Sequence, residues 1–263
     1  MVKFSIVTVV KNGLSKISTT VESVLSQTYD NYEHVIIDGD SVDGTLDVVS
    51  GYNSRKIFLY SEPDNGLYDA MNKGIKLSTG DYILFLNAGD KLSTSNVLQD
   101  ISSAIHSNMK NENFRPSIVY GDSIEFISTR EMYYKKSRNC KWRNYGMFTH
   151  HQAIFYNLFL VKAANIVYQT NYKIAADWEF TLRVLKYEYC PIRVDFPVCN
   201  FEDGGISTIA FRIGLEEQYL IRRKVLKMSI INSLAIKILQ LSIIKIRRKF
   251  PLIYAKVKFR KVY

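Results

Sequence analysis

The sequence predicts an α/β protein, and three observations support this fold class. Apolar, β-rich runs alternate with stretches of helical spacing over the first ninety residues. The runs are apolar on both faces, which is typical of parallel strands covered by helices on both sides of a sheet. Polar residues follow the ends of four successive runs. Since right-handed crossovers place the connecting helices, the first third of the chain should form a parallel, helix-covered sheet.

The expected elements follow from the positions of the apolar runs and of the stretches with helical spacing. The apolar runs predict strands at 4–10, 34–37, 57–60 and 82–86, and helical spacing predicts helices at 17–25, 46–52, 67–77 and 95–109. Shorter strands are expected at 118–120, 123–127 and 131–135, with a hairpin turn at 128–130. A helix at 177–186, a strand at 192–196, a glycine loop at 204–205 and a helical, basic segment at 206–249 complete the expected order.

Composition limits the class of protein. With 263 residues, 47% of them hydrophobic, the chain can bury a substantial core. Cys140, Cys190 and Cys199 form no CxxC pair and are odd in number, which favours a reducing compartment. The first apolar run is followed by Lys11 and Asn12 rather than by a cleavage site, so no signal peptide is expected. We therefore expect a cytoplasmic protein.

Charge divides the chain into a body, residues 1–217, and a tail, residues 218–263. The net charge is +10, but the tail holds 13 Lys and Arg and no acidic residue. The body therefore has 22 basic and 25 acidic residues, a net charge of −3. A mildly acidic body argues against a nucleic-acid groove and against nucleic acid as a partner.

The tail predicts a basic amphipathic helix. Its longest charge-free run is the nine residues 228–236, too short for a spanning helix, which needs about 20 apolar residues. Ile231, Leu234, Ile238 and Leu241 recur on one helical stripe, with cations at both ends. Such a helix can lie at the surface of an anionic bilayer. The alternative is that the stripe packs onto the body or onto a second subunit of a homo-oligomer.

Polar residues cluster where the four expected strands of the first third end. They are Thr8, Lys11 and Asn12, then 38–41, then 62–64, then 87–90. In open α/β sheets, ligands bind beyond the carboxyl ends of the strands. Turn formers and helix caps are the alternative at any single end. Neither a dinucleotide fingerprint nor a P-loop is present, so bound phosphates would need a cation or basic side chains.

Four ordered segments carry a specific resemblance. Residues 4–12, 35–45, 61–74 (SEPDNGLYDAMNKG) and 85–90 (FLNAGD) resemble the opening half of family 2 inverting glycosyltransferases of the GT-A fold. The similarity returns at 150–152, 175–178 and 204–207. The branch it resembles makes bacterial O-antigen, capsule or exopolysaccharide. The resemblance implies a nucleotide-sugar-binding half at 1–92 and an acceptor half at 93–217.

The resemblance also implies a set of donor-binding residues. Asp38 would accept a hydrogen bond from N3–H of uracil, and Thr8 and Asn12 would line the pocket for base and ribose. Asp64 would lie near the ribose or phosphates, and Lys73 would offset phosphate charge. The alternatives are that Asp38 caps a turn and that Lys73 lies on a solvated helix face.

The implied metal ligand is Asp90. Asn87-Ala88-Gly89-Asp90 takes the place of the family's D-x-D motif, and only its last residue is acidic. One carboxylate can still hold Mn²⁺ or Mg²⁺, because such ions keep few protein ligands when a diphosphate supplies oxygens. The alternative is that Asp90 caps the following segment.

The implied general base is Asp177. Inversion is a single displacement and needs a base on the acceptor side, opposite the leaving diphosphate. Glu179 is the fallback base. Trp178 could stack on a sugar or belong to the core. His150 and His151 would lie near the acceptor or the diphosphate, and the 204–207 loop would close over the donor.

The predicted function is transfer of a hexosyl or N-acetylhexosaminyl group from a UDP-sugar to a hydroxyl of a lipid-linked oligosaccharide. The reaction would occur at the inner face of a bacterial plasma membrane, with the enzyme attached peripherally. A non-catalytic nucleotide-sugar-binding or membrane-scaffolding protein is one alternative. A sugar nucleotidyltransferase is another, although the chain lacks its glycine-rich loop after the first strand.

Overall fold

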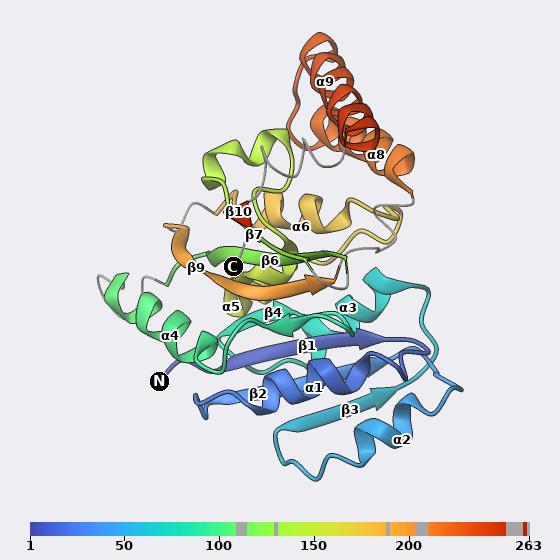
Figure 1. Ribbon diagram of the computed structural model, residues 1–263. Helices are drawn as coiled ribbons and strands as arrows, with labels where there is room; N and C mark the ends of the chain where they lie inside the picture. Colours follow the sequence, from blue (N-terminus) through green and yellow to red (C-terminus); the bar gives the residue numbers. More distant parts are fainter. Residues whose placement is uncertain (109–114, 129–130, 188–189, 203–209, 251–259, 262–263) are drawn as a thin grey trace.

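The structure is a computed structural model that describes residues 1–108, 115–128, 131–187, 190–202, 210–250 and 260–261. Most of the expected turn at 128–130 and all of the glycine loop at 204–207 lie outside the residues that the structure describes. One mixed sheet runs through the molecule, with helices on both faces (Figure 1). The predicted α/β fold class is confirmed.

The first half of the sheet is parallel. Strands β1 (Phe4–Val10), β2 (Tyr32–Asp38), β3 (Ile57–Ser61) and β4 (Tyr82–Phe85) lie in the order β3-β2-β1-β4. They are joined by helices α1 (Ile17–Leu25), α2 (Thr45–Ser50) and α3 (Leu67–Leu77). Because all four strands run the same way, their carboxyl ends meet at one edge of the sheet.

The second half extends the same sheet with mixed pairing. Strand β8 (Ile154–Asn157) pairs antiparallel with both β4 and β6 (Ile118–Ser128). Strand β6 pairs antiparallel with β7 (Glu131–Lys135) and parallel with β9 (Ile192–Glu202). The short strands β5 (Lys91–Leu92) and β10 (Arg260–Lys261) pair with β9 and β7. The path from edge to edge is β10-β7-β6-β8-β4-β1-β2-β3.

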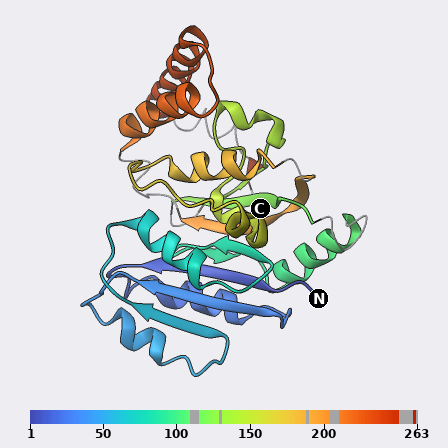
Figure 2. The same cartoon turned by 180° about the vertical axis from the view of Figure 1, so that it is seen from behind.

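Helices cover the two faces of the sheet in separate groups. Helices α3, α5 (Leu158–Ala163) and α6 (Ala176–Val184) pack in one cluster with Val7 and Val9 of β1. Helices α1, α2 and α4 (Val97–Asn108) pack with the alternate residues Phe4, Ile6 and Val10 on the other face. Figure 2 shows the molecule from behind. The alternation along β1 is the period of two that a strand buried on both faces requires.

Close approach of α3 to the sheet depends on Gly74. A Cβ at this position would lie 2.5 Å from a methyl carbon of Val7. Only glycine fits there without displacing the strand or the helix. Helix α3 is therefore held tightly against β1, with its first turn at the carboxyl edge of the sheet.

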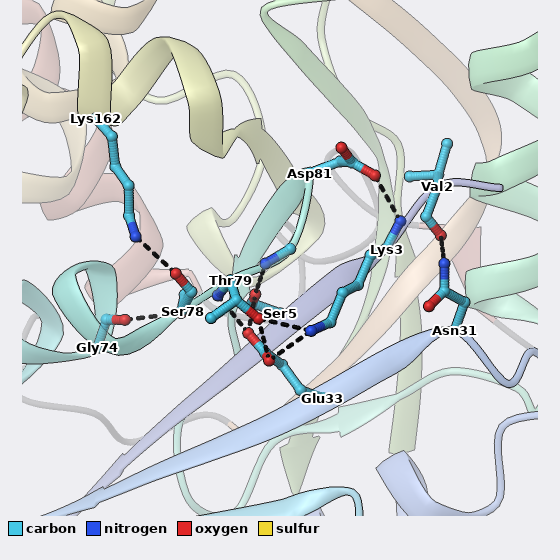
Figure 3. Close-up of polar contacts among 11 residues, drawn as sticks. Val2, Lys3, Ser5, Asn31, Glu33, Gly74, Ser78, Thr79, Asp81 and Lys162 are labelled. Carbon is cyan, nitrogen blue, oxygen red and sulfur yellow. Dashed lines mark hydrogen bonds and ion pairs between the residues drawn. The ribbon is translucent and has the colours of Figure 1, made fainter.

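A polar network connects the strands at the opposite edge of the sheet, where the parallel strands begin (Figure 3). The buried carboxylate of Glu33 accepts hydrogen bonds from the hydroxyls of Ser5 and Thr79, both at 2.6 Å. Lys3 pairs with the same carboxylate at 3.0 Å. Burial alone would raise the pKa of Glu33, but these hydrogen bonds outweigh it and the pKa is lowered. The network ties β1, β2 and the end of α3 together, far from the carboxyl edge.

As far as the structure describes the tail, two helices take the place of the one continuous helical segment that was expected. Helix α8 (Phe211–Lys224) ends in a turn where Lys227 has φ +51°, and α9 (Ile230–Lys249) follows. The two helices lie at the end of the molecule opposite β3 (Figure 1). The expected boundary at 217/218 falls inside α8, where Ile221 and Arg222 are fully buried. Helix α8 is thus part of the packed body, and α9 is the segment that projects.

Candidate active site

One large cavity lies along the carboxyl edge of the sheet, between the two halves of the chain. Its volume is about 1010 Å³. The first half of the chain, residues 1–92, contributes 9–13 and 64–70, among them Asn12, Asp64, Tyr68 and Asp69, together with Asn87. The acceptor half contributes Glu125, Lys135, His150, His151, Gln152, Tyr172, Asp177 and Phe201. Of the polar strand-end residues that the sequence singled out, the cavity is lined by Lys11, Asn12, Asp64 and Asn87 but not by Thr8, Asp38 or Asp90.

Asp38 ends β2 and is completely buried. Its Oδ2 accepts hydrogen bonds from the Ser41 amide at 2.9 Å and the Ser61 hydroxyl at 2.8 Å. Its Oδ1 is buried and has no partner. A buried acceptor without a donor costs about 1–3 kcal/mol. Asp38 therefore has the turn-capping role, and it is not among the residues that line the cavity.

Thr8 lies behind the cavity rather than on its wall. Its hydroxyl is fully buried on β1, 2.9 Å from Nε2 of His34. Burial lowers the pKa of His34 to about 3, so this imidazole is neutral at neutral pH. Asn12 does line the cavity, in a left-handed conformation with φ +51°. Its Oδ1 accepts from the Val42 amide at 3.0 Å, which holds the loop after β1 against the loop after β2.

Asp64 lines the cavity, and Lys73 does not. Asp64 accepts from the Gly66 amide at 2.8 Å, and its other oxygen would lie 2.2 Å from a Cβ at Gly39. Glycine at position 39 therefore allows this carboxylate to approach the end of β2. Lys73 donates to the Pro63 carbonyl at 2.7 Å and pairs with Glu62 at 2.9 Å. Lys73 thus holds the loop before α3.

The end of β4 brings together Asn87, Asp90 and Gln152. Asp90 is 5% exposed and accepts from the Gln152 amide nitrogen at 2.8 Å. The side-chain carbonyl oxygens of Asn87 and Gln152 are buried without a partner. Hard divalent ions prefer such oxygens, so this donor set fits Mg²⁺ or Mn²⁺. Among the described residues, no group of three or more His, Cys, Asp or Glu is arranged to hold a metal ion.

Asp177 lies in the first turn of α6 and lines the cavity. Its Oδ1 accepts from the Trp178 amide at 2.8 Å, and its Oδ2 lies 3.6 Å from Nδ1 of His151. The other ring nitrogen of His151 lies 3.4 Å from the side-chain nitrogen of Asn87. His151 therefore stands between the carboxylate on α6 and the end of β4.

Trp178 and Glu179 point away from the cavity. Trp178 is 1% exposed, and its indole N–H donates to the Arg143 carbonyl at 2.8 Å. Its ring packs beneath the guanidinium of Arg222, 5.6 Å from the ring centre. Glu179 is buried and pairs with Arg183 at 2.9 Å. The structure therefore supports a place in the core for Trp178 rather than stacking on a sugar.

Two residues that the sequence did not single out hold the segment leading to Asp177. The buried carboxylate of Glu217, on α8, accepts from the amides of residues 173, 174 and 175 at 2.6, 2.9 and 2.9 Å. From the other side, the hydroxyl of Tyr68, on α3, donates to the Ile174 carbonyl at 2.8 Å. The backbone before Asp177 is thus fixed by both halves of the chain.

A second group of polar residues lies where β6 and β7 border the cavity. Glu125, 7% exposed, lies 2.6 Å from the Lys135 ammonium and 2.7 Å from Nε2 of His150. The His150 ring stacks on Phe201 with a centroid separation of 4.4 Å. Burial lowers the pKa of His150 to about 4. Burial alone would raise the pKa of Glu125, but His150 and Lys135 lower it to about 2.

Solved structures share this architecture. Staphylococcus aureus TarS (residues 1–349) in complex with UDP-GlcNAc has a TM-score of 0.65 at 17% identity, covering 89% of this chain and 70% of that one. The mannosyltransferase PcManGT from Pyrobaculum calidifontis, in complex with GDP-Man and Mn²⁺, has a TM-score of 0.64 at 14% identity, covering 90% and 70%. The fold of this chain is therefore GT-A-like.

Sequence similarity identifies the family. The profile of glycosyl transferase family 2 matches residues 5–168. A PGL/p-HBAD biosynthesis glycosyltransferase of Mycobacterium tuberculosis is 31% identical over 193 residues, which cover 68% of each chain. The chain belongs to glycosyltransferase family 2. Membership of this family argues against the alternative that the protein is a sugar nucleotidyltransferase.

Proposed function

We propose that the protein transfers a sugar from a UDP-sugar to an acceptor hydroxyl with inversion, using Asp177 as general base. The observation that carries this proposal is a single cavity that extends from Asn12 and Asp64 to Asp177. Asp38 does not line this cavity, but its buried Oδ1 has no donor and would match the N3–H of uracil. The complex of TarS with UDP-GlcNAc supports a uridine donor by analogy of fold.

Asp177 is suited to accept the proton of the attacking hydroxyl. It lies on the cavity wall with 20% of its side chain exposed, so a ligand can reach it. The Trp178 amide holds one oxygen and leaves the other facing His151. With a proton on Nδ1, His151 would orient this carboxylate, and its contact with Asn87 would hold the ring. The acceptor would then approach between Asp177 and the donor.

Asp90, with the amide oxygens of Asn87 and Gln152, would hold a divalent cation. Such an ion offsets the charge that develops on a leaving diphosphate. In this arrangement Gln152 positions the Asp90 carboxylate through their 2.8 Å hydrogen bond. PcManGT was solved in complex with GDP-Man and Mn²⁺, which supports a divalent cation as cofactor of this chain.

The proposed acceptor is a lipid-linked saccharide in the synthesis of a bacterial surface glycoconjugate. The similarity to a glycosyltransferase of PGL/p-HBAD biosynthesis supports this class of pathway. No helix in the described part of the chain is both long enough and apolar enough to cross a bilayer.

Helix α9 is the proposed membrane contact, because its apolar side faces solvent. Ile231, Ile238 and Leu239 are 79%, 58% and 60% exposed. Its polar side contacts α8 instead: the Gln240 side chain bonds to Gln218 and Arg222 at 2.8 and 2.9 Å, and Lys237 pairs with Glu216 at 2.5 Å. This orientation argues against the alternative in which the stripe packs onto the body.

Cations accompany the exposed apolar side of α9. Lys227, Lys245 and Lys249 are all exposed. Each cation near an anionic bilayer contributes about 1 kcal/mol, in addition to burial of the apolar side chains. We therefore propose attachment of α9 to the inner face of a bacterial plasma membrane, with the apolar side chains in the interface and the lysines at the headgroups.

Liposome sedimentation tests the membrane contact. The full-length protein should bind phosphatidylserine vesicles and lose this binding as salt rises. Replacing Ile231, Ile238 and Leu239 by Asn should abolish binding, whereas Val42→Asn, which changes an 87% exposed apolar residue elsewhere, should not. Undiminished binding of the triple variant would disprove the contact. Salt-independent self-association lost in the same variant would instead indicate a second copy of the chain.

A thermal-shift screen tests the donor. UDP-sugars with Mn²⁺ should raise Tm, since a ligand that binds only the native state stabilises it by RT ln(1 + [L]/Kd). The sugar that gives the largest shift should then support UDP release. A protein that binds nucleotide-sugars but releases no UDP with or without divalent ion would be the non-catalytic alternative. A protein that binds none of them would refute the proposed function.

A further inference from the structure

The order of strands at the carboxyl edge sets the order of groups along the cavity. From the proposed uracil site at Asp38 on β2, the path runs through β1 and β4, then β8, then β6. Neighbouring strands are about 4.8 Å apart, so Glu125 on β6 lies roughly 19 Å from β2 along the sheet. The proposed diphosphate position at Asn87 and Asp90, after β4, is about halfway. A sugar attached to that diphosphate would lie over β8, where His151 borders the cavity.

The group beyond that position consists of Glu125, Lys135, His150 and Phe201. All four line the cavity and come from the acceptor half. His150 and His151 are consecutive, yet His150 contacts Glu125 while His151 contacts Asp177. One peptide bond therefore joins His150 of the cluster to His151, the residue that faces the proposed base. A molecule that presents a hydroxyl to Asp177 would extend over the cluster.

The chemistry of the cluster suits a neutral sugar. The Glu125 carboxylate accepts from hydroxyl groups, and the Lys135 ammonium donates to them, so the pair can hold two adjacent hydroxyls of one ring. The stacked imidazole and phenyl rings offer an apolar surface for the C–H face of a pyranose. The Glu125 carboxylate and the Lys135 ammonium lie 2.6 Å apart, and their opposite charges balance. The cluster therefore has no excess charge with which to select a phosphate or a uronate.

We propose that Glu125, Lys135, His150 and Phe201 form the subsite for the acceptor sugar, and that this sugar is a neutral pyranose with adjacent free hydroxyls. The proposal rests on the proposed function and specifies its acceptor. The Lys135 and His150 side chains are 25% and 20% exposed, so a ring can reach their polar atoms. The 2.6 Å contact between Lys135 and Glu125 holds both groups in place before the acceptor arrives.

Acceptor kinetics test the subsite in the full-length protein. UDP release is measured with the UDP-sugar found by thermal shift and with a panel of p-nitrophenyl glycosides of neutral hexoses and of uronic acids. At least one neutral glycoside should accelerate UDP release by the wild type. Glu125→Gln and Lys135→Gln should each raise the KM of that glycoside by about tenfold or more, as loss of a charge-assisted hydrogen bond does. The affinities for UDP and for the UDP-sugar should remain within twofold.

Lys56→Gln and Asp30→Asn are the matched controls, because this ion pair is of the same type and lies on the surface, 2.9 Å apart. Their kinetics should equal those of the wild type. An unchanged KM in a folded Glu125→Gln protein would overturn the subsite, as would acceleration by uronides alone or by no glycoside. Weaker binding of the UDP-sugar, with unchanged binding of UDP, would assign the cluster to the donor sugar instead. Failure to bind any UDP-sugar would refute the proposed function rather than the subsite alone.

Discussion

Glu217→Gln should separate a positioning role from a purely structural one. In the native protein, one carboxylate oxygen accepts from the amide of Lys173 and the other from the amides of Ile174 and Ala175. Glutamine keeps one acceptor oxygen and turns an NH₂ group toward the remaining amide. One buried N–H then loses its partner, and the other two face a neutral acceptor.

The expected loss of stability follows from these three bonds. A hydrogen bond to a charged group contributes about 1.5–3 kcal/mol, and an unsatisfied buried N–H costs about 1–3 kcal/mol. Because such terms are not additive, we expect a loss of about 2–3 kcal/mol in the free energy of unfolding. For a domain of this size this lowers Tm by about 4–12 °C.

The expected effect on activity is larger than the stability loss alone would produce. The released backbone leads directly to Asp177, and a displacement of about 1 Å at a reacting group can reduce the rate about a hundredfold. Well below Tm, kcat for UDP release should therefore fall at least tenfold, while the donor Kd stays constant. Glu216→Gln is the matched control, since its neighbouring carboxylate is exposed and pairs with Lys237. A Glu217→Gln protein with lower Tm but wild-type kcat would refute the positioning role.

Three further predictions concern single carboxylates. Asp177→Asn should reduce transfer by roughly a hundredfold or more without weakening donor binding, and unchanged turnover in steady-state assays would exclude it as the base. Asp90→Ala should lessen the dependence of turnover on Mn²⁺ and weaken UDP binding by calorimetry; wild-type activity in excess chelator would contradict this assignment. Because the pKa of Glu33 is lowered in the folded state, its stabilising effect is present above the ordinary carboxyl value of 4.5 and is lost as pH falls below it. Glu33→Gln should therefore flatten the acid limb of the unfolding free energy measured in urea, and an identical acid limb in both proteins would show that Glu33 contributes nothing there.

Elements with a clear local period could be predicted from the sequence. Strand β1 and helices α1 and α3 have the bounds expected for them, because their apolar spacing and flanking polar residues are local signals. Strand β6 was expected as two pieces, interrupted at Gly121 and Asp122. In the structure Gly121 packs against the β9 backbone, where a Cβ would lie 2.7 Å from the Phe196 carbonyl. Asp122 is buried beside Arg193 and Ser137, so neither residue ends the strand.

Which residues at the ends of consecutive parallel strands border the cavity could be predicted in part for the same reason. Asp64 and Asn87 follow strands whose pairing order the fold class implies, and both line the cavity, whereas Asp38 does not. Glu125 and Glu217 gave no such signal, because their partners lie at least 10 residues away and meet them only through antiparallel pairing or helix packing. The break between α8 and α9 was also missed, since it contains neither glycine nor proline.

The contacts between α3 and the acceptor half have a consequence for how the enzyme opens and unfolds. Besides the bond from Tyr68 to Ile174, the Asn72 side chain pairs with both backbone groups of Tyr168, at 2.9 and 2.7 Å. The rings of Tyr68 and Tyr168 stack, and β4 continues the sheet into β8. A hinge between the two halves would break all of these contacts at once. We therefore expect the two halves to act as one rigid body that melts in a single calorimetric transition, and we expect the proposed product, UDP, to leave through movements at the rim of the cavity.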